Sequence, residues 1–267
     1  MLPDPIFWRV HMYGVMIAVG LLANFLVLYG YGKKTAMHTD FLDFIFYNAI
    51  ASIVLGFGAA ALFQALYNYI EDPAGGFHFG GITFLGGLVG GVATFLLGYF
   101  LFRRRLHGTM RQILNIAPCC ITIAHAFGRV GCFFAGCCYG KETDSVLGVK
   151  FPRLPRPVYP TQLYEAVFLF LLFGVLSYLL LKKKFRYNMP VYLFAYGAFR
   201  FALEFLRGDH RGQFFGVISP SQFWSLAFIL IGAVMLYLLK RLYRVSPSAL
   251  PAEDLPLPDD LSENKSK

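Results

Sequence analysis

Seven long apolar segments constrain the fold of this chain more than any other feature. A helix that crosses a bilayer needs about 20 mostly apolar residues. Seven segments meet this requirement, at 12–32, 42–66, 82–102, 111–128, 162–181, 189–206 and 220–240. Only 15% of the residues are charged, against about 25% in soluble domains. We therefore expect an all-α, polytopic integral membrane protein with about seven transmembrane helices around a lipid-accessible cavity.

Basic residues cluster after alternate apolar segments. They are Lys33, Lys34, Arg103, Arg104, Arg105, Arg111, Lys182, Lys183, Lys184, Arg186, Lys240, Arg241 and Arg244. The positive-inside rule then predicts an N-terminus outside and a C-terminus in the cytoplasm. The net charge of +9 is accounted for by this topology, and nucleic-acid binding is not indicated. One membrane domain is expected over 1–244, followed by a disordered cytoplasmic tail at 245–267, rich in Pro, Ser and acidic residues.

The segment H-A-F-G-R-V-G-C-F-F-A-G-C-C-Y-G, residues 125–140, places Arg129 at the end of an apolar stretch. An arginine at the centre of a membrane helix costs about 2.5–3.5 kcal/mol on insertion scales and is usually functional. Its planar fork of donors suits a phosphate group. Gly128 and Gly131 leave room for the close approach of a helix or a ligand. The alternative is an arginine that snorkels to the headgroups.

A second polar helix face contains Tyr196, Arg200 and Glu204, which are spaced four residues apart. A structural ion pair between Arg200 and Glu204 is the alternative interpretation. Two intramembrane arginines on separate segments suggest a shared polar cavity.

The segment Y-P-T-Q-L-Y-E, residues 159–165, resembles a helix start. Thr161 would cap the helix, and Glu165 would lie in its first turn, where the helix dipole favours a carboxylate. Capping does not explain Gln162 and Tyr164 together at the membrane interface.

Five motifs together resemble those of the prolipoprotein diacylglyceryl transferase family. They occur in the family's order, at Tyr13–Met16 (Y-G-x-M), Thr83–Leu88 (F-H-G-G-L), Gly128–Phe133 with Gly140 (the signature), Tyr159–Glu165 (H-P-S-Q-L-Y-E) and Tyr196–Arg207 (the Arg/Glu helix). The resemblance implies an enzyme that moves the diacylglyceryl group of phosphatidylglycerol to the lipobox cysteine of a prolipoprotein signal peptide. A thioether forms and glycerol phosphate leaves. The expected location is the bacterial inner membrane, and no metal or organic cofactor is implied.

The resemblance also assigns roles to individual residues. Arg129 and Arg200 would bind the phosphate, and Glu204 and Tyr196 would orient that cluster. Further substrate-binding positions would be Tyr13, Gly128, Gly131, Gly140, Gln162, Tyr164 and Arg207.

Four positions depart from the family pattern. Leu85 replaces the histidine of F-H-G-G-L, Cys132 and Ala135 replace two asparagines, and Cys137 replaces a glutamate. We hypothesise that His125 supplies the missing base, because it lies four residues before Arg129 on the same helical face. A polar contact between helices is the alternative role for this histidine. The departures also keep open a paralogue with another acceptor, or a non-catalytic protein that binds lipid or anions.

The cysteines allow several interpretations. Cys132, Cys137 and Cys138 lie near the outer face, where a Cys132–Cys137 or Cys132–Cys138 disulfide could persist. A catalytically active thiol is also possible. The lack of C-x-x-C spacing argues against a zinc site made of these thiols and the neighbouring histidine. Cys119 and Cys120 are expected to be small packing residues.

Overall fold

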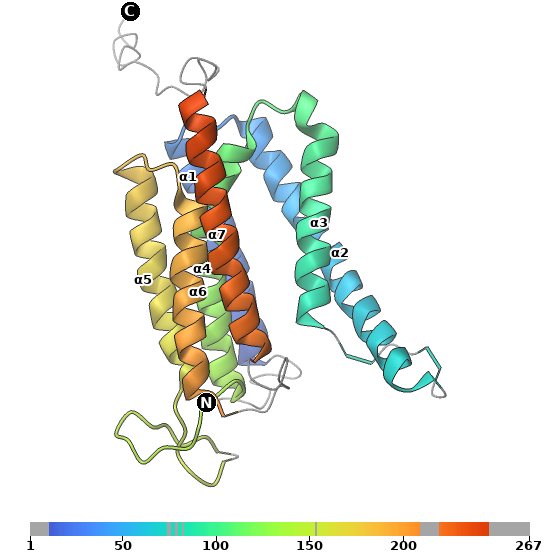
Figure 1. Cartoon of the computed structure of the whole chain (residues 1–267), viewed down its shortest axis with the longest axis vertical. Coiled ribbons are helices and arrows are strands. Elements are labelled where there is room, and N and C mark those ends of the chain that lie inside the picture. Colours follow the sequence, from blue (N-terminus) through green and yellow to red (C-terminus); the bar gives the residue numbers. More distant parts are fainter. Residues whose placement is uncertain are drawn as a thin grey trace, which may run out of the picture. The chain divides into compact units, whose positions relative to one another are not determined.

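The computed structural model describes residues 11–73, 76–77, 80–81, 83–152, 154–208 and 219–245, and its regular structure in these ranges is helical. The α-helices are α1 (Met12–Lys34), α2 (Thr39–Glu71), α3 (Phe84–Phe102), α4 (Met110–Ala135), α5 (Thr161–Leu181), α6 (Asn188–Leu203) and α7 (Pro220–Val245) (Figure 1). Short 3-10 helices follow α3 and α6, at Arg103–Arg105 (η2) and Glu204–Leu206 (η3). The predicted all-α class is confirmed.

Six helices in the described ranges, α1 to α5 and α7, are long and apolar enough to cross a membrane. The chain is therefore a multi-pass membrane protein. The sixth predicted span differs, because α6 has only 16 residues and is about 24 Å long. This length is below the roughly 30 Å of a bilayer core, and η3 continues the helix at its C-terminal end.

The chain divides into two compact units, which are described separately. Unit 1 comprises Met1–Asn188 and Leu206–His210, and unit 2 comprises Met189–Phe205 and Arg211–Lys267. The single domain expected over 1–244 stays a prediction. The expected disordered tail lies outside the described residues beyond Val245.

Small residues bring the helices of unit 1 close together. Helix α4 packs against α1 and α5, and α2 packs against α3. A methyl group on Gly20 would come within 3.0 Å of the Ala124 carbonyl oxygen, so α1 and α4 approach closely there. On the α2–α3 side, Gly90 lies directly against Ala59. Such contacts let helices associate in lipid, where apolar burial alone provides little driving force.

Helix α4 extends beyond the predicted span of 111–128. A capping box between Thr109 and Gln112 begins the helix, which ends only at Gly136, where the backbone turns left-handed (φ 69°). Glycine adopts this conformation without steric cost. Arg129 therefore lies on the same helix as His125, as the hypothesis for this histidine requires, and Cys132 lies in the last turn.

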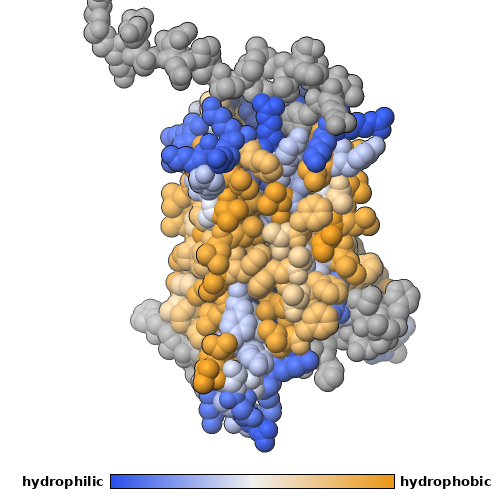
Figure 2. Space-filling view, turned by 60° about the vertical axis from the view of Figure 1, so that its left-hand side comes forward, coloured by the Kyte–Doolittle hydropathy of each residue, from blue (hydrophilic) through white to orange (hydrophobic). Residues whose placement is uncertain are grey.

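Polar and apolar side chains are segregated along the helices. In Figure 2 apolar side chains cover the middle of the visible face, and polar side chains gather at its two ends. Within unit 1, the C-terminal ends of α1, α3 and α5 lie at the same end (Figure 1). Basic residues mark these ends, including Lys33, Lys34, Arg103, Arg104, Arg105 and Lys182.

Candidate active site

Arg129 forms a polar cluster with His125 and Glu165 inside unit 1. Its Nη2 atom lies 3.0 Å from Glu165 Oε1, and its Nε–H donates a hydrogen bond to His125 Nε2 at 3.2 Å. His125 Nε2 is 3.6 Å from the same carboxylate oxygen. The side chain of Glu165 is only 1% exposed, whereas that of Arg129 is 17% exposed. The arginine is thus held from its buried side and remains partly accessible.

The geometry of this Arg129 cluster follows from helix packing. His125 and Arg129 are four residues apart, so they share one face of α4, and α5 packs against α4 and supplies Glu165. A buried ion pair stabilises only when both partners are present, because either charge alone is costly in an apolar environment. The cluster therefore depends on the contact between the two helices.

The partner of Arg129 was missed in the sequence. Glu165 was expected in the first turn of its helix, but α5 begins at Thr161 and has no acidic residue in that turn. Glu165 lies one position further on, fully buried, and pairs with Arg129. The signal that could have revealed it is a carboxylate inside an apolar span, which requires a nearby cation.

The first residues of α5 hold the loop that follows α4. Thr161 Oγ1–H donates to the Cys138 carbonyl oxygen at 2.9 Å, and Gln162 Nε2–H donates to the Cys137 carbonyl oxygen at 2.9 Å. Both α5 side chains are buried. Pro160, at the N-cap, makes no side-chain capping bond. The predicted capping role of Thr161 is therefore wrong, since its hydroxyl fixes the backbone of the loop.

Gly140 and Arg207 lie where this loop meets the chain after η3. Their backbones form an isolated antiparallel bridge, and Lys141 N–H donates to the Leu206 carbonyl oxygen at 2.8 Å. A methyl group at Gly140 would come within 2.5 Å of the Leu206 carbonyl oxygen and 2.8 Å of Thr161 Cγ2. Glycine is thus required at position 140 by close packing. Arg207 is buried.

Among the other predicted substrate-binding residues, Tyr13 is half-exposed on α1. A methyl group on Gly131 would lie 3.2 Å from Tyr13 Cδ2, so these two residues are in close contact. Gly128 has more room, because the nearest atom to such a methyl group would be Ile17 Cδ1 at 3.8 Å. Tyr164 is at the surface, where its hydroxyl donates to the Leu147 carbonyl oxygen at 3.4 Å.

Arg200 forms a second polar cluster, inside unit 2. Its Nη1 atom lies 2.9 Å from Glu204 Oε2, and its Nη2–H donates to Ser221 Oγ at 2.9 Å. Ser219 Oγ–H donates to Glu204 Oε1 at 2.9 Å. The predicted pairing between positions i and i+4 is present, although the α-helix ends at Leu203 and Glu204 belongs to η3.

Tyr196 lies one turn before Arg200 and is buried. Its ring stacks on Tyr192, with centroids 5.8 Å apart and planes 5° apart, and contacts Phe228 of α7 at 6.2 Å. The predicted cavity shared by Arg129 and Arg200 stays a prediction, because the two arginines belong to different units.

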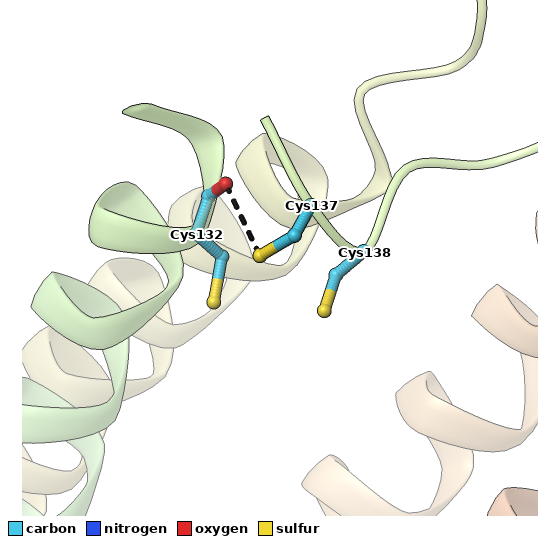
Figure 3. Close-up of side chains that lie close together, drawn as sticks. All are labelled: Cys132, Cys137 and Cys138. Carbon is cyan, nitrogen blue, oxygen red and sulfur yellow. Dashed lines mark hydrogen bonds between the residues drawn. The ribbon is translucent and has the colours of Figure 1, made fainter. Parts of the chain in front are cut away.

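The five cysteines, all among the described residues, are free thiols. The structure therefore contains neither of the disulfides considered from the sequence. Cys119 and Cys120 are buried in α4, as expected for packing residues. The thiols of Cys132, Cys137 and Cys138 lie together at the end of α4 (Figure 3), with their sulfur atoms within 4.8 Å of one another.

The environment of Cys138 favours its thiolate. Hydrogen bonds from the thiols of Cys132 and Cys137, followed by the charges of Arg129 and Arg207, lower the pKa of Cys138 from its ordinary value although burial opposes them. Hydrogen bonds and positive charges stabilise the ionised form of a thiol.

An apolar pocket of about 500 Å³ opens between α2 and α3 of unit 1. Its lining includes Ser52, Gly56, Thr83 and Gly91, with Asn24 of α1. Leu85, at the position of the family's histidine, lies in the first turn of α3, and its side chain is outside the described part of the structure.

These features define a class: multi-pass membrane proteins in which arginine–carboxylate pairs lie among apolar helices. Residues 5–238 match the family model described as prolipoprotein diacylglyceryl transferase. The chain therefore belongs to the prolipoprotein diacylglyceryl transferase family.

Three curated relatives illustrate the similarity, and each is named a phosphatidylglycerol–prolipoprotein diacylglyceryl transferase. The protein from Clostridium tetani is 35% identical over 84% of this chain and 91% of its own length. The second such transferase of Clostridium perfringens is 33% identical over 88% and 92% of the two chains. The protein from Hydrogenovibrio crunogenus is 35% identical over 84% and 88%. The similarity thus extends over nearly the whole of both chains.

Proposed function

We propose that this protein transfers the diacylglyceryl group of phosphatidylglycerol to the thiol of a lipobox cysteine in a prolipoprotein signal peptide. The products are a thioether-linked prolipoprotein and glycerol phosphate. The family match and the names of the relatives support this proposal. The structural observation that supports the proposal is the position of Arg129, whose guanidinium lies 3.0 Å from a buried carboxylate among apolar helices.

Arg129 has the properties that the leaving group requires. When the acceptor sulfur attacks the glyceryl carbon, the carbon–oxygen bond to phosphate breaks and negative charge develops on the departing oxygen. A fixed cation in a water-poor site stabilises this charge more effectively than a solvated one. Glu165 holds the guanidinium from its buried side, and in this proposal the partly exposed side of the group would bind the phosphate.

We assign a phosphate-binding role to Arg200 as well, on the similarity of its segment to the Arg/Glu helix of the family. Glu204 and Ser221 hold its guanidinium by contacts of 2.9 Å each. Ser221 and Glu204 contact the guanidinium directly, and Ser219 in turn holds the carboxylate of Glu204. A preorganised donor loses little freedom when the lipid binds.

The base hypothesis for His125 stays a prediction. Its Nε2 atom accepts the Nε–H of Arg129, so the ring must release this bond before it takes a proton at Nε2. In its present position His125 orients Arg129, which makes it a positioning residue in the proposed mechanism.

We also propose the bacterial inner membrane as the location, with the N-terminus outside. The basic ends of α1, α3 and α5 would then face the cytoplasm. The Arg129 cluster, toward the other end of α4, would lie near the outer leaflet, where signal peptides of exported proteins are accessible.

The test is a product assay in liposomes that contain phosphatidylglycerol and a peptide with a lipobox cysteine. We expect the wild-type protein to add one diacylglyceryl mass to the peptide and release glycerol phosphate. Arg129→Ala and Arg200→Ala should abolish the product. Arg156→Ala is the matched control, because Arg156 is 71% exposed in a loop and its nearest carboxylate, Glu142, is 3.8 Å away.

Two outcomes would overturn the proposal. Lipid binding without any covalent product, from protein that remains monodisperse in detergent, would indicate a non-catalytic lipid-binding protein. An adduct on a different thiol or hydroxyl acceptor, with the lipobox peptide unmodified, would indicate a paralogue that uses the same donor.

A further inference from the structure

Three thiols converge at the end of α4, beside the proposed active site. Cys132 lies in the last turn of the helix, and Cys137 and Cys138 follow the turn at Gly136. In Figure 3 the Cys137 side chain points back to Cys132, and all three sulfur atoms lie within 4.8 Å of one another. The sequence analysis considered disulfides between pairs of these cysteines, and the three thiols come together because the chain reverses after the helix.

The backbone around the thiols is fixed by several independent contacts. The left-handed residues Gly136 (φ 69°) and Cys138 (φ 63°) reverse the chain, and Cys137 N–H donates to the Cys132 carbonyl oxygen at 3.1 Å. The buried side chains of Thr161 and Gln162 bind the carbonyl groups of Cys138 and Cys137. The positions of the three thiols are therefore set by contacts of the surrounding backbone, and not only by contacts between the thiols.

The spacing of the sulfur atoms suits a thiophilic metal ion. A zinc–thiolate bond is about 2.3 Å long, so three ligands of a tetrahedral zinc lie about 3.8 Å apart. The observed limit of 4.8 Å is close enough for small side-chain rotations to complete such a site. Arg129 and Arg207 are near enough to influence Cys138 electrostatically, and they would offset the net negative charge of three thiolates around one zinc ion.

We propose that Cys132, Cys137 and Cys138 bind one zinc ion, whose fourth coordination position takes the acceptor thiol of the substrate peptide. This inference rests on the proposed function. Three protein ligands with one open position are typical of catalytic zinc, whereas structural zinc has four. Cys137 is exposed, and Cys132 and Cys138 are partly exposed, so the open position can face a ligand.

The zinc ion would deprotonate the acceptor thiol, a role for which this chain has Leu85 in place of the family's histidine. A thiol that coordinates zinc is deprotonated, so the acceptor loses its proton to water on binding. Its sulfur then attacks the glyceryl carbon of the lipid, a carbon–sulfur bond forms, and the carbon–oxygen bond to phosphate breaks. The electron pair leaves on the phosphate oxygen, and the zinc ion and the three protein thiolates are unchanged. No side-chain base is needed for this proton.

The first test measures metal binding by the full chain, purified in detergent under reducing conditions and without substrate. We expect one equivalent of zinc by elemental analysis, and a thiolate-to-metal charge-transfer band when cobalt replaces it. Cys132→Ser, Cys137→Ser and Cys138→Ser should each lose the band. Cys119→Ala, a buried thiol of the same helix, is the control that should keep it. Absence of bound zinc, a band that survives all three substitutions, or a disulfide within the cluster would overturn the site.

The second test measures transfer to the lipobox peptide before and after zinc is removed with a chelator and restored. Loss of transfer on removal and recovery on restoration would support the role in thiol activation. Unchanged transfer by metal-free protein would overturn that role. Zinc-loaded protein that forms no adduct under any condition would instead refute the proposed function, so the two failures are distinguishable.

Discussion

Replacing Glu165 by leucine should destabilise the protein strongly, because the substitution leaves Arg129 without its buried counter-ion. At 3.0 Å and an effective dielectric constant of 20, two unit charges attract by about 5.5 kcal/mol. Removing one partner of such a pair costs about 3–5 kcal/mol, since the other charge stays buried. We therefore expect Glu165→Leu to lower the free energy of unfolding by an amount in this range.

The assay is denaturation by SDS in mixed micelles, with the fraction folded followed by circular dichroism. The double variant Arg129→Met/Glu165→Leu removes both charges and should recover most of the lost stability, because an apolar pair often replaces a buried ion pair without cost. The double variant should nevertheless lack transferase activity, since it lacks the cation that is proposed to bind the phosphate. Comparison of the single and double variants therefore separates the effect of the ion pair on stability from the effect of Arg129 on activity.

The matched control is Glu142→Leu. Glu142 lies 3.8 Å from Arg156, with both side chains largely exposed (57% and 71%), and an exposed pair contributes only about 0–1 kcal/mol. Two results would refute the reasoning: Glu165→Leu with wild-type stability, or a double variant no more stable than Glu165→Leu. Either would mean that the ion pair does not stabilise the contact between α4 and α5.

The remaining predictions concern the loop after α4 and are measured by the same unfolding assay. Gly140→Ala should cost about 1–3 kcal/mol, because the added methyl group would overlap the Leu206 carbonyl oxygen. The control Gly128→Ala has its nearest contact at 3.8 Å and should be at least as stable as the wild type, because alanine has the higher helix propensity. Gln162→Leu should cost about 1–3 kcal/mol, because it removes the buried side-chain donor to the Cys137 carbonyl oxygen, and a wild-type midpoint would contradict that role.

Local features of the site were predictable from the sequence. The contact of Arg129 with His125 and that of Arg200 with Glu204 both follow from a spacing of four residues on a helix. The apolar segments likewise predicted the helices, because length and hydropathy alone decide which segments can cross a bilayer.

Features that depend on tertiary packing were not predictable in this way. Glu165 meets Arg129 only because α5 packs against α4, and no local pattern encodes that contact. The continuation of α4 to Ala135 was missed because the apolar run on which the span was predicted is interrupted by Arg129. In the structure Gly131 contacts α1 closely, so packing between helices outweighs the low helix propensity of glycine.

The pairing of Arg129 with Glu165 has a consequence for how the protein is made. During synthesis α4 emerges before α5, so the arginine reaches the translocation channel without its carboxylate. Exposure of an arginine at the centre of a membrane helix to lipid costs about 2.5–3.5 kcal/mol. Arg129 lies nearer the end of α4, but a cost of the same sign favours retention of α4 beside the channel until α5 arrives. The two helices would then leave the channel together, and a chain in which α5 fails to follow would display an unpaired charge to membrane proteases.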